Sequence, residues 1–162
     1  DFNEDGHPDS LYTAGDNADY TPIRKPYHGM YGYLNNGQNQ FEPLFFYPLH
    51  GAYAAKATDF DGDGDLDIAA ISFFPDYLEK KSRGFVYLEN KGDYQFEAAT
   101  FEAVDMGRWI VMDMADYDRD GDADLLLGSL AFEVSDNPAL PTQWKADGIP
   151  FVVLENVGKL AQ

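Results

Sequence analysis

The sequence contains no cysteine among its 162 residues. Disulfide bonds and cysteine-based zinc or redox centres are therefore excluded. Basic residues are also scarce, with 11 lysine and arginine residues against 29 aspartate and glutamate residues and a formal net charge of −18. Such a chain repels nucleic acid and anionic lipid headgroups, so we expect neither nucleic-acid binding nor membrane insertion. A chain with this negative charge is expected to bind cations.

Long apolar runs are missing as well. No segment approaches the ~18 consecutive apolar residues that a membrane-spanning helix requires. The first residues do not show the basic, apolar and small-residue segments of a signal peptide. Hydrophobic residues nevertheless make up 44% of the chain and aromatic residues 15%. This composition excludes a disordered acidic tail and is sufficient for the core of one domain.

Two sequence elements recur in the same order along the chain. An acidic loop of the form Asp-x-Asp/Asn-x-Asp-Gly-x-x-Asp occupies residues 1–9, 59–67 and 116–124. A strand-and-turn element ends at Gly37, Gly92 and Gly158. The loops begin 58 and then 57 residues apart. A fixed period of this kind is typical of a repeat protein.

Each repeat has the pattern of short strands separated by turns, and no helical period is present. In the middle repeat we expect strands at about 52–58, 68–74, 84–89 and 94–100. The second of these is apolar on both faces, as in a strand buried between two sheets. The fourth alternates between polar and apolar residues, as in an outer strand. Four strands graded from buried to exposed predict a β-propeller blade, and hence an all-β fold.

The repeats divide the chain at residues 1–50, 51–107 and 108–162. We expect the middle repeat to be a complete blade, the first to lack its first strand and the third to lack its fourth. Three blades do not close a ring, because propellers use roughly four to eight. We therefore expect part of a larger propeller of seven blades, whose open faces are covered by the remaining blades or by self-association.

The acidic loops have the composition of calcium sites. They offer oxygen atoms at positions one, three, five and nine, and calcium takes six to eight oxygen ligands at about 2.3–2.6 Å. Fourteen of the 29 acidic residues lie in these loops, which is repulsive unless a cation is present. One isolated loop could also be a solvated turn, since Asp and Gly favour turns, but three loops at matched spacing favour the ion. An EF-hand would carry Glu at position twelve, where this chain has Tyr12, Ala70 and Leu127.

With these loops and strands the chain resembles the FG-GAP/VCBS repeats of integrin alpha subunits and bacterial surface proteins. The Phe-Gly and Gly-Ala-Pro signatures are absent, and residues 51–53 and 107–109 take comparable places, so the chain is more similar to the bacterial branch. The resemblance implies up to three calcium ions and an extracellular, cell-surface or periplasmic location. The side chains that it implies as ligands are Asp1, Asn3, Asp5 and Asp9; Asp59, Asp61, Asp63 and Asp67; and Asp116, Asp118, Asp120 and Asp124. It implies that His7, Asp65 and Asp122 bind through their backbone carbonyls.

The loops expected on the opposite rim gather seven of the eleven basic residues, together with several aromatic residues. These basic residues are Arg24, Lys25, Lys80, Lys81, Arg83, Arg108 and Lys145. Aromatic and basic groups on exposed loops suit a protein or carbohydrate ligand, although long loops also collect polar residues without a function. The ligand-binding candidates are His50, Tyr53, Arg108, Trp109 and Trp144.

No catalytic motif is recognisable, and no histidine lies at metal-ligand spacing to another. We therefore expect a non-enzymatic, calcium-stabilised scaffold that binds a protein or a carbohydrate. The chain is also similar to polysaccharide lyases built on calcium-bearing propellers, which leaves an enzyme as an alternative. That resemblance implies His50, Tyr53 and Arg108 as its candidate residues. A structural spacer between other domains is the third possibility.

Overall fold

The computed structural model of the chain describes residues 1–16, 18, 20–79 and 83–158. Within these residues, ten strands form three antiparallel sheets, which confirms the predicted all-β class. Each sheet follows the chain order, so that every strand pairs with its neighbour in sequence. No helix in this part of the chain is long and apolar enough to cross a membrane.

The three sheets lie within the three predicted repeat ranges. The first contains β1 (Ser10–Ala14), β2 (Gly29–Asn35) and β3 (Phe41–Pro48). The second contains β4 (Ala52–Thr58), β5 (Asp67–Ser72), β6 (Phe85–Asn90) and β7 (Phe96–Ala99). The third contains β8 (Trp109–Ala115), β9 (Asp124–Ser129) and β10 (Phe151–Leu154).

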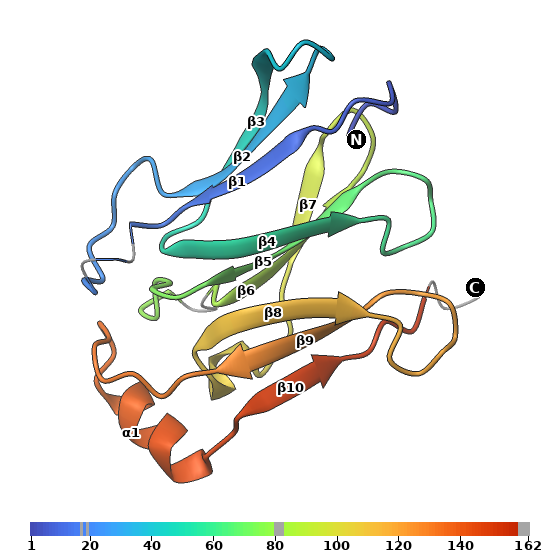
Figure 1. Cartoon of the computed structure of the whole chain (residues 1–162). Helices are drawn as coiled ribbons and strands as arrows, with labels where there is room; N and C mark the ends of the chain where they lie inside the picture. Colours follow the sequence, from blue (N-terminus) through green and yellow to red (C-terminus); the bar gives the residue numbers. More distant parts are fainter. Residues whose placement is uncertain (17, 19, 80–82, 159–162) are drawn as a thin grey trace.

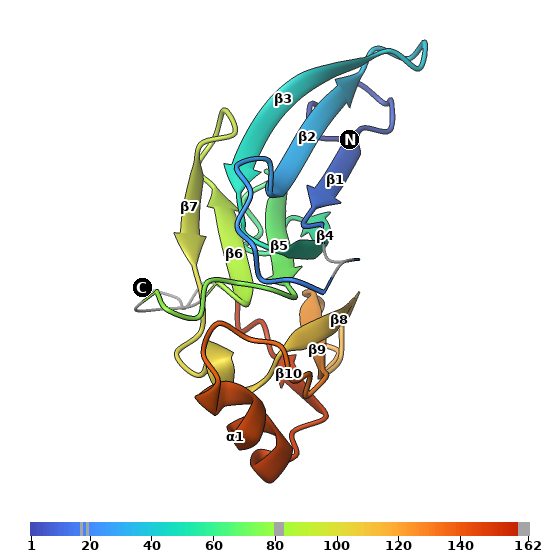
Figure 2. The ribbon, with the colours of Figure 1, turned by 90° about the vertical axis from the view of Figure 1, so that its left-hand side faces the viewer.

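The sheets follow one another face to face, like successive blades of a propeller (Figures 1 and 2). The described residues do not close them into a ring. Between the first and second sheets, Met30 packs with Ile68 and Leu88. Between the second and third, Ile71 packs with Trp109 and Leu127. Strand β5 contributes to both cores and is buried at every residue, as its two-sided apolar pattern predicts.

The predicted strand positions of the middle repeat are close to those observed. Strand β4 has the predicted bounds, and β5 and β6 each begin within one residue of them. Strand β7 begins two residues later than predicted. Asp93 and Tyr94 have φ of 50° and 58°, so the turn continues through both residues before the extended backbone starts.

The sequence predicts no helix. This prediction is wrong for one segment, which forms α1 (Ala139–Asp147). This helix lies in the connection between β9 and β10. Leu140 and Trp144 are four residues apart, so they share one helix face, and both are buried against Tyr77. Gly148 ends the helix with φ of 63° and donates its N–H to the Trp144 carbonyl at 3.0 Å. Tertiary packing stabilises this single short helix, because its own length is too small to do so.

Candidate metal centres

The three acidic loops lie on the same side of the structure (Figure 1). Residues 59–67 connect β4 to β5 and residues 116–124 connect β8 to β9, while residues 1–9 lead into β1. The connection that contains α1 lies on the opposite side. The fold therefore brings the acidic residues of three distant segments to one rim.

Left-handed backbone at two positions curls each loop. Position four has φ of 58° at Glu4, 74° at Gly62 and 71° at Arg119. Position six has φ of 85° at Gly6, 100° at Gly64 and 102° at Gly121. Open space surrounds the place of a Cβ atom at all three position-six glycines. Backbone conformation, rather than crowding, therefore selects glycine there.

This curl turns backbone N–H groups towards the carboxylates at the start of each loop. In the middle loop, Asp59 accepts the N–H groups of Gly62, Asp63 and Gly64 at 2.8, 3.1 and 3.0 Å. In all three loops, position three accepts the N–H of position five, at 3.3, 3.1 and 3.1 Å. Position five accepts the N–H of position seven, at 2.9, 3.0 and 3.2 Å. The repeated bonds hold the side-chain oxygens of positions one, three and five on the inside of the curl.

Two loops bring three carboxylates together. One oxygen each of Asp59, Asp61 and Asp67 lies within 4.8 Å of the others, and the same holds for Asp116, Asp118 and Asp120. In the first loop an asparagine, Asn3, stands at position three, and its amide donates to Asp5 at 3.0 Å. The predicted ligands of the second and third loops thus include groups that can share one ion.

The crowding has an electrostatic cost in the third loop. Partial loss of hydration, and the charge of the neighbouring Asp120 carboxylate, raise the pKa of the exposed Asp118 above its ordinary value, although the N–H of Asp120 acts to lower it. Burial and Asp120 also raise the pKa of Asp122. One Asp122 oxygen is buried and accepts no hydrogen bond from the described residues. A bound cation would remove this penalty, because an opposite charge favours the ionised carboxylate. The donor set, oxygen throughout, fits calcium.

Position nine has a role that the sequence does not predict. Asp9, Asp67 and Asp124 each accept the N–H of the position-two residue, at 2.6, 3.1 and 2.7 Å. With the other oxygen, each accepts the N–H of an asparagine at 2.8 Å. The asparagine ends β2 or β6 in the first two repeats and lies two residues after β10 in the third. Asp67 is fully buried and Asp124 is 2% exposed. These carboxylates therefore fasten the loop to the sheet, besides offering lone pairs to an ion.

The partner asparagines are functional residues that sequence reasoning missed. They are Asn35, Asn90 and Asn156, and each also accepts the N–H of the glycine two residues later, at 3.1 Å. The Asn-x-Gly that recurs in the strand-and-turn element could have identified these asparagines from the sequence. In the third loop, the N–H groups of Asn156 and Tyr117 lower the pKa of Asp124.

Position seven, predicted to bind through its carbonyl, also places its side chain against the same turn. The space that a Cβ atom would need at Gly37 is taken by the His7 ring. Asp65 and Asp122 approach Gly92 and Gly158 in the corresponding way, at 4.0 and 3.7 Å from the place of a Cβ. The turn glycines thus leave room for position seven.

The opposite rim differs from the sequence expectation. Arg108 and Trp109 are fully buried and Trp144 is 2% exposed, so the exposed position predicted for these three side chains is wrong. The Arg108 guanidinium lies 4.9–5.7 Å from five aromatic ring centres: Phe73, Phe74, Tyr77, Phe132 and Trp144. One of its nitrogens donates to the Val134 carbonyl. Trp109 donates to the Val104 carbonyl at 2.9 Å. Both side chains organise the interior of this rim rather than its surface.

The other basic residues of this rim are paired with acids wherever the structure describes them. Lys80 and Lys81 lie outside the described residues. Arg24 pairs with Asp76 and, at 3.3 Å, with Asp136. Lys25 pairs with Asp16, Arg83 with Glu79 at 3.8 Å, and Lys145 with Glu133 at 2.6 Å. These pairs cancel much of the positive potential that the sequence suggests.

His50 and Tyr53 do not share a pocket with Arg108. His50 lines a small pocket with Pro48, Asp76 and Arg83, and neither Tyr53 nor Arg108 contributes to it. Tyr53 is 43% exposed and faces solvent. Tyr53 and Arg108 instead both approach the ring of Phe73, at 6.1 Å between ring centres and 5.1 Å from the guanidinium carbon.

Comparison with known proteins gives one similarity, in the first part of the chain. A search of curated proteins found no match. The family model for the FG-GAP-like repeat matches residues 1–70. This range contains the first two acidic loops and the whole first sheet, and it confirms the resemblance seen in the sequence. Residues 1–70 of this protein are therefore similar to the FG-GAP-like repeat.

Proposed function

We propose that each acidic loop binds one calcium ion and that the chain is a calcium-stabilised binding scaffold of a secreted or cell-surface protein. One observation carries the proposal: three loops, far apart in sequence, share the same hydrogen-bond pattern, which turns their oxygen atoms inward. The FG-GAP-like match over residues 1–70 supports a repeat-based module.

The chemistry of the loops favours calcium over other ions. Magnesium prefers a rigid octahedron in which it keeps several waters, whereas calcium accepts many carboxylates in a flexible site. Zinc prefers cysteine and histidine, and the loops contain only His7 of these residue types. The position-nine carboxylate belongs to the loop and also bonds to an asparagine of its sheet. An ion that draws the loop together would therefore also stabilise the attachment of the loop to the sheet.

The rim opposite the loops is the proposed binding surface for a protein or carbohydrate. Exposed aromatic and apolar side chains lie on it, among them Tyr20 and Ile23 between β1 and β2 and Tyr53 at the start of β4, at 58%, 59% and 43% exposure. Aromatic side chains supply large contact areas at low entropic cost. The proposed role is non-enzymatic, because the sequence contains no recognisable catalytic motif.

Calcium titration by calorimetry, with magnesium as the control ion, tests the proposal. We expect three sites with dissociation constants of ~10⁻⁴–10⁻³ M, the range of extracellular modules. Chelation should lower the melting temperature. A melting curve indifferent to both calcium and chelator would refute calcium stabilisation, and equal binding of magnesium would refute the choice of ion.

A further inference from the structure

The residue at position two of an acidic loop lies between two of the proposed calcium ligands, at positions one and three. Phe2 and Phe60 occupy this position in the first and second loops. Each donates its N–H to the position-nine carboxylate of its own loop, at 2.6 and 3.1 Å. Because peptide groups are planar, the N–H of position two fixes the plane that leads to position one. Its carbonyl fixes the plane that leads to position three.

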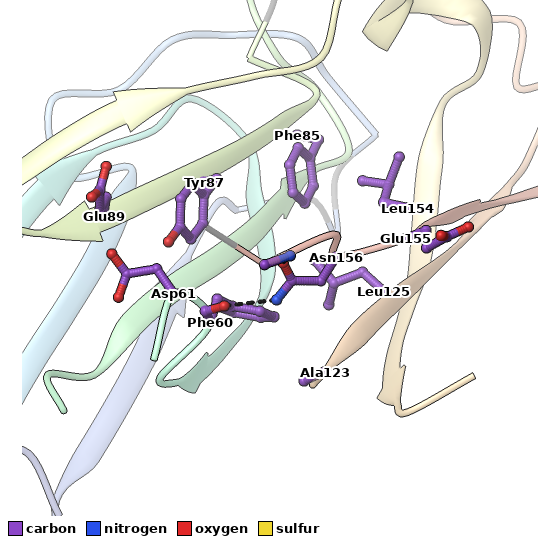
Figure 3. Close-up of a pocket in the computed structure, with 11 residues that line it drawn as sticks. Phe60, Asp61, Phe85, Tyr87, Glu89, Ala123, Leu125, Leu154, Glu155 and Asn156 are labelled. Atoms are coloured by element: carbon purple, nitrogen blue, oxygen red, sulfur yellow. Dashed lines mark hydrogen bonds between the residues drawn. The ribbon is translucent and has the colours of Figure 1, made fainter. Parts of the chain in front are cut away.

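The carbonyl of position two accepts a hydrogen bond from the following repeat. The Tyr94 hydroxyl donates to the Phe2 carbonyl at 3.1 Å. The side-chain amide of Asn156 donates to the Phe60 carbonyl at 2.7 Å, which is the dashed line in Figure 3. Both donors belong to the segment that follows the third strand of their sheet, β6 or β10. The same contact between a loop and the next repeat therefore occurs at both interfaces, although the donors are different residue types.

The asparagine of the third repeat differs from its counterparts in the first two. The side-chain amides of Asn35 and Asn90 donate to position eight of their own loops, the carbonyls of Pro8 and Leu66, at 3.1 and 3.4 Å. The side-chain amide of Asn156 donates to the preceding repeat instead, over a shorter distance. The bond between repeats is thus not a by-product of how each turn folds.

The segments that supply these donors are also bound to their own loops. Asp67 of the second loop accepts the N–H of Asn90, and Asp124 of the third loop accepts the N–H of Asn156, both at 2.8 Å. The turn from Asn90 to Tyr94 is closed by backbone hydrogen bonds of 2.8 and 3.0 Å. A continuous series of bonds and one short turn therefore joins the three loops in order.

We propose that the three loops bind calcium cooperatively, each through the turn that contacts the loop before it. This inference rests on the calcium binding proposed above. Order in the second loop fixes Asp67 and, through Asn90, the turn that carries Tyr94. Tyr94 in turn holds position two of the first loop, so less conformational entropy is lost when that loop binds its ion. The coupling acts equally in both directions. One hydrogen bond between neutral groups sets its scale, about two- to tenfold in affinity.

Nuclear magnetic resonance of the full chain measures each loop separately. The amide signals of the position-six glycines, Gly6, Gly64 and Gly121, report calcium binding to the first, second and third loops. Titrations at ~0.15 M salt limit repulsion between ions in neighbouring loops. Asp63→Ala disables the second loop and keeps the Asp67 anchor. We expect it to lower the calcium affinity of the first and third loops about two- to tenfold.

Tyr94→Phe removes the coupling hydroxyl and keeps the ring. In this background, the effect of disabling the second loop should vanish at Gly6 and persist at Gly121, which serves as the internal control. Tyr31→Phe is the matched control, because it removes a hydroxyl that donates to the Tyr27 carbonyl at 2.7 Å. It should leave both couplings unchanged. A general loss of stability would move both glycines together and would not distinguish the two tyrosines.

Tyr94→Phe alone gives a second measurement, should Asp63→Ala fail to fold. With the second loop intact, it should lower the calcium affinity of the first loop by the same two- to tenfold. Three loops that bind calcium independently, or a coupling that survives Tyr94→Phe, would overturn this inference and leave the proposed function standing. Glycine signals that do not respond to calcium would refute both.

Discussion

Asp67 and Asp63 belong to the same acidic loop but hold different bonds, so replacing each with alanine separates the anchor from the ion site. The buried Asp67 carboxylate accepts the N–H groups of Phe60 and Asn90 at 3.1 and 2.8 Å, and the Tyr87 hydroxyl at 2.8 Å. The exposed Asp63 carboxylate accepts the N–H of Asp65 at 3.0 Å. We expect Asp67→Ala to lower the free energy of unfolding both with and without calcium. We expect Asp63→Ala to lower it only when calcium is present.

The magnitudes follow from burial. An orphaned buried donor costs about 1–3 kcal/mol, and Asp67→Ala orphans two of them, while the Tyr87 hydroxyl can turn to water. The free energy of unfolding should therefore fall by about 2–6 kcal/mol. Water replaces the lost acceptor in Asp63→Ala, so its cost without calcium should stay within about 0.5 kcal/mol. At calcium concentrations tenfold above the dissociation constant, the loss of one site should add about 1.4 kcal/mol.

Denaturant unfolding of both variants, in calcium and in chelator, measures these four differences. For a chain of this size, each 1 kcal/mol corresponds to about 2–4 °C in melting temperature. If Asp67→Ala and Asp63→Ala lost the same free energy in calcium and neither lost any in chelator, Asp67 would be an ion ligand only. The anchoring role derived from its three hydrogen bonds would then be wrong.

Three further predictions concern the loop backbone and the opposite rim. Gly64→Ala places a Cβ at φ of 100° and should cost about 1–2 kcal/mol of unfolding free energy; an unchanged denaturation midpoint would show that the loop relaxes. Arg108→Ala empties the centre of five aromatic rings and should cost about 2–5 kcal/mol; a variant as stable as the parent would show that the guanidinium organises nothing. Burial raises the pKa of Tyr77 to about 12 from 10.0, so the folded state holds this proton more tightly than the unfolded state. The resulting stability is complete below pH 10 and is lost as the pH rises towards 12; Tyr77→Phe should remove this part of the pH dependence, and identical profiles for the two proteins would contradict it.

The sequence alone determined the features that depend on residues near one another in the chain. The acidic loops are local, since nine consecutive residues supply the carboxylates, the left-handed glycines and the hydrogen bonds that hold them. The strands are local too, because alternation and apolar runs report which faces are buried. The FG-GAP-like repeat model matches residues 1–70, where the first two of these loops lie.

Only the tertiary structure decided which side chains of the opposite rim are exposed. Arg108 and Trp109 follow a loop and carry charge or polar groups, features that favour the surface in a sequence. Five rings from three other segments surround Arg108, and a sequence gives no distance between residues 73, 132 and 144. The ion pairs of Arg24 could not be predicted from the sequence either, because its partners lie 52 and 112 residues away along the chain.

The anchoring by position nine also needed the tertiary structure. Asp67 and Asn90 are 23 residues apart, and each occurs in a motif with its own local explanation. The two edge-to-face ring pairs Phe2–Phe45 and Phe60–Tyr87, at 5.9 and 5.8 Å, also depend on it. They use different positions of the repeat, because the second ring lies on β3 in one pair and on β6 in the other. Alignment of the repeats does not reveal this equivalence. Packing does, because it depends on where a ring lies and not on which strand supplies it.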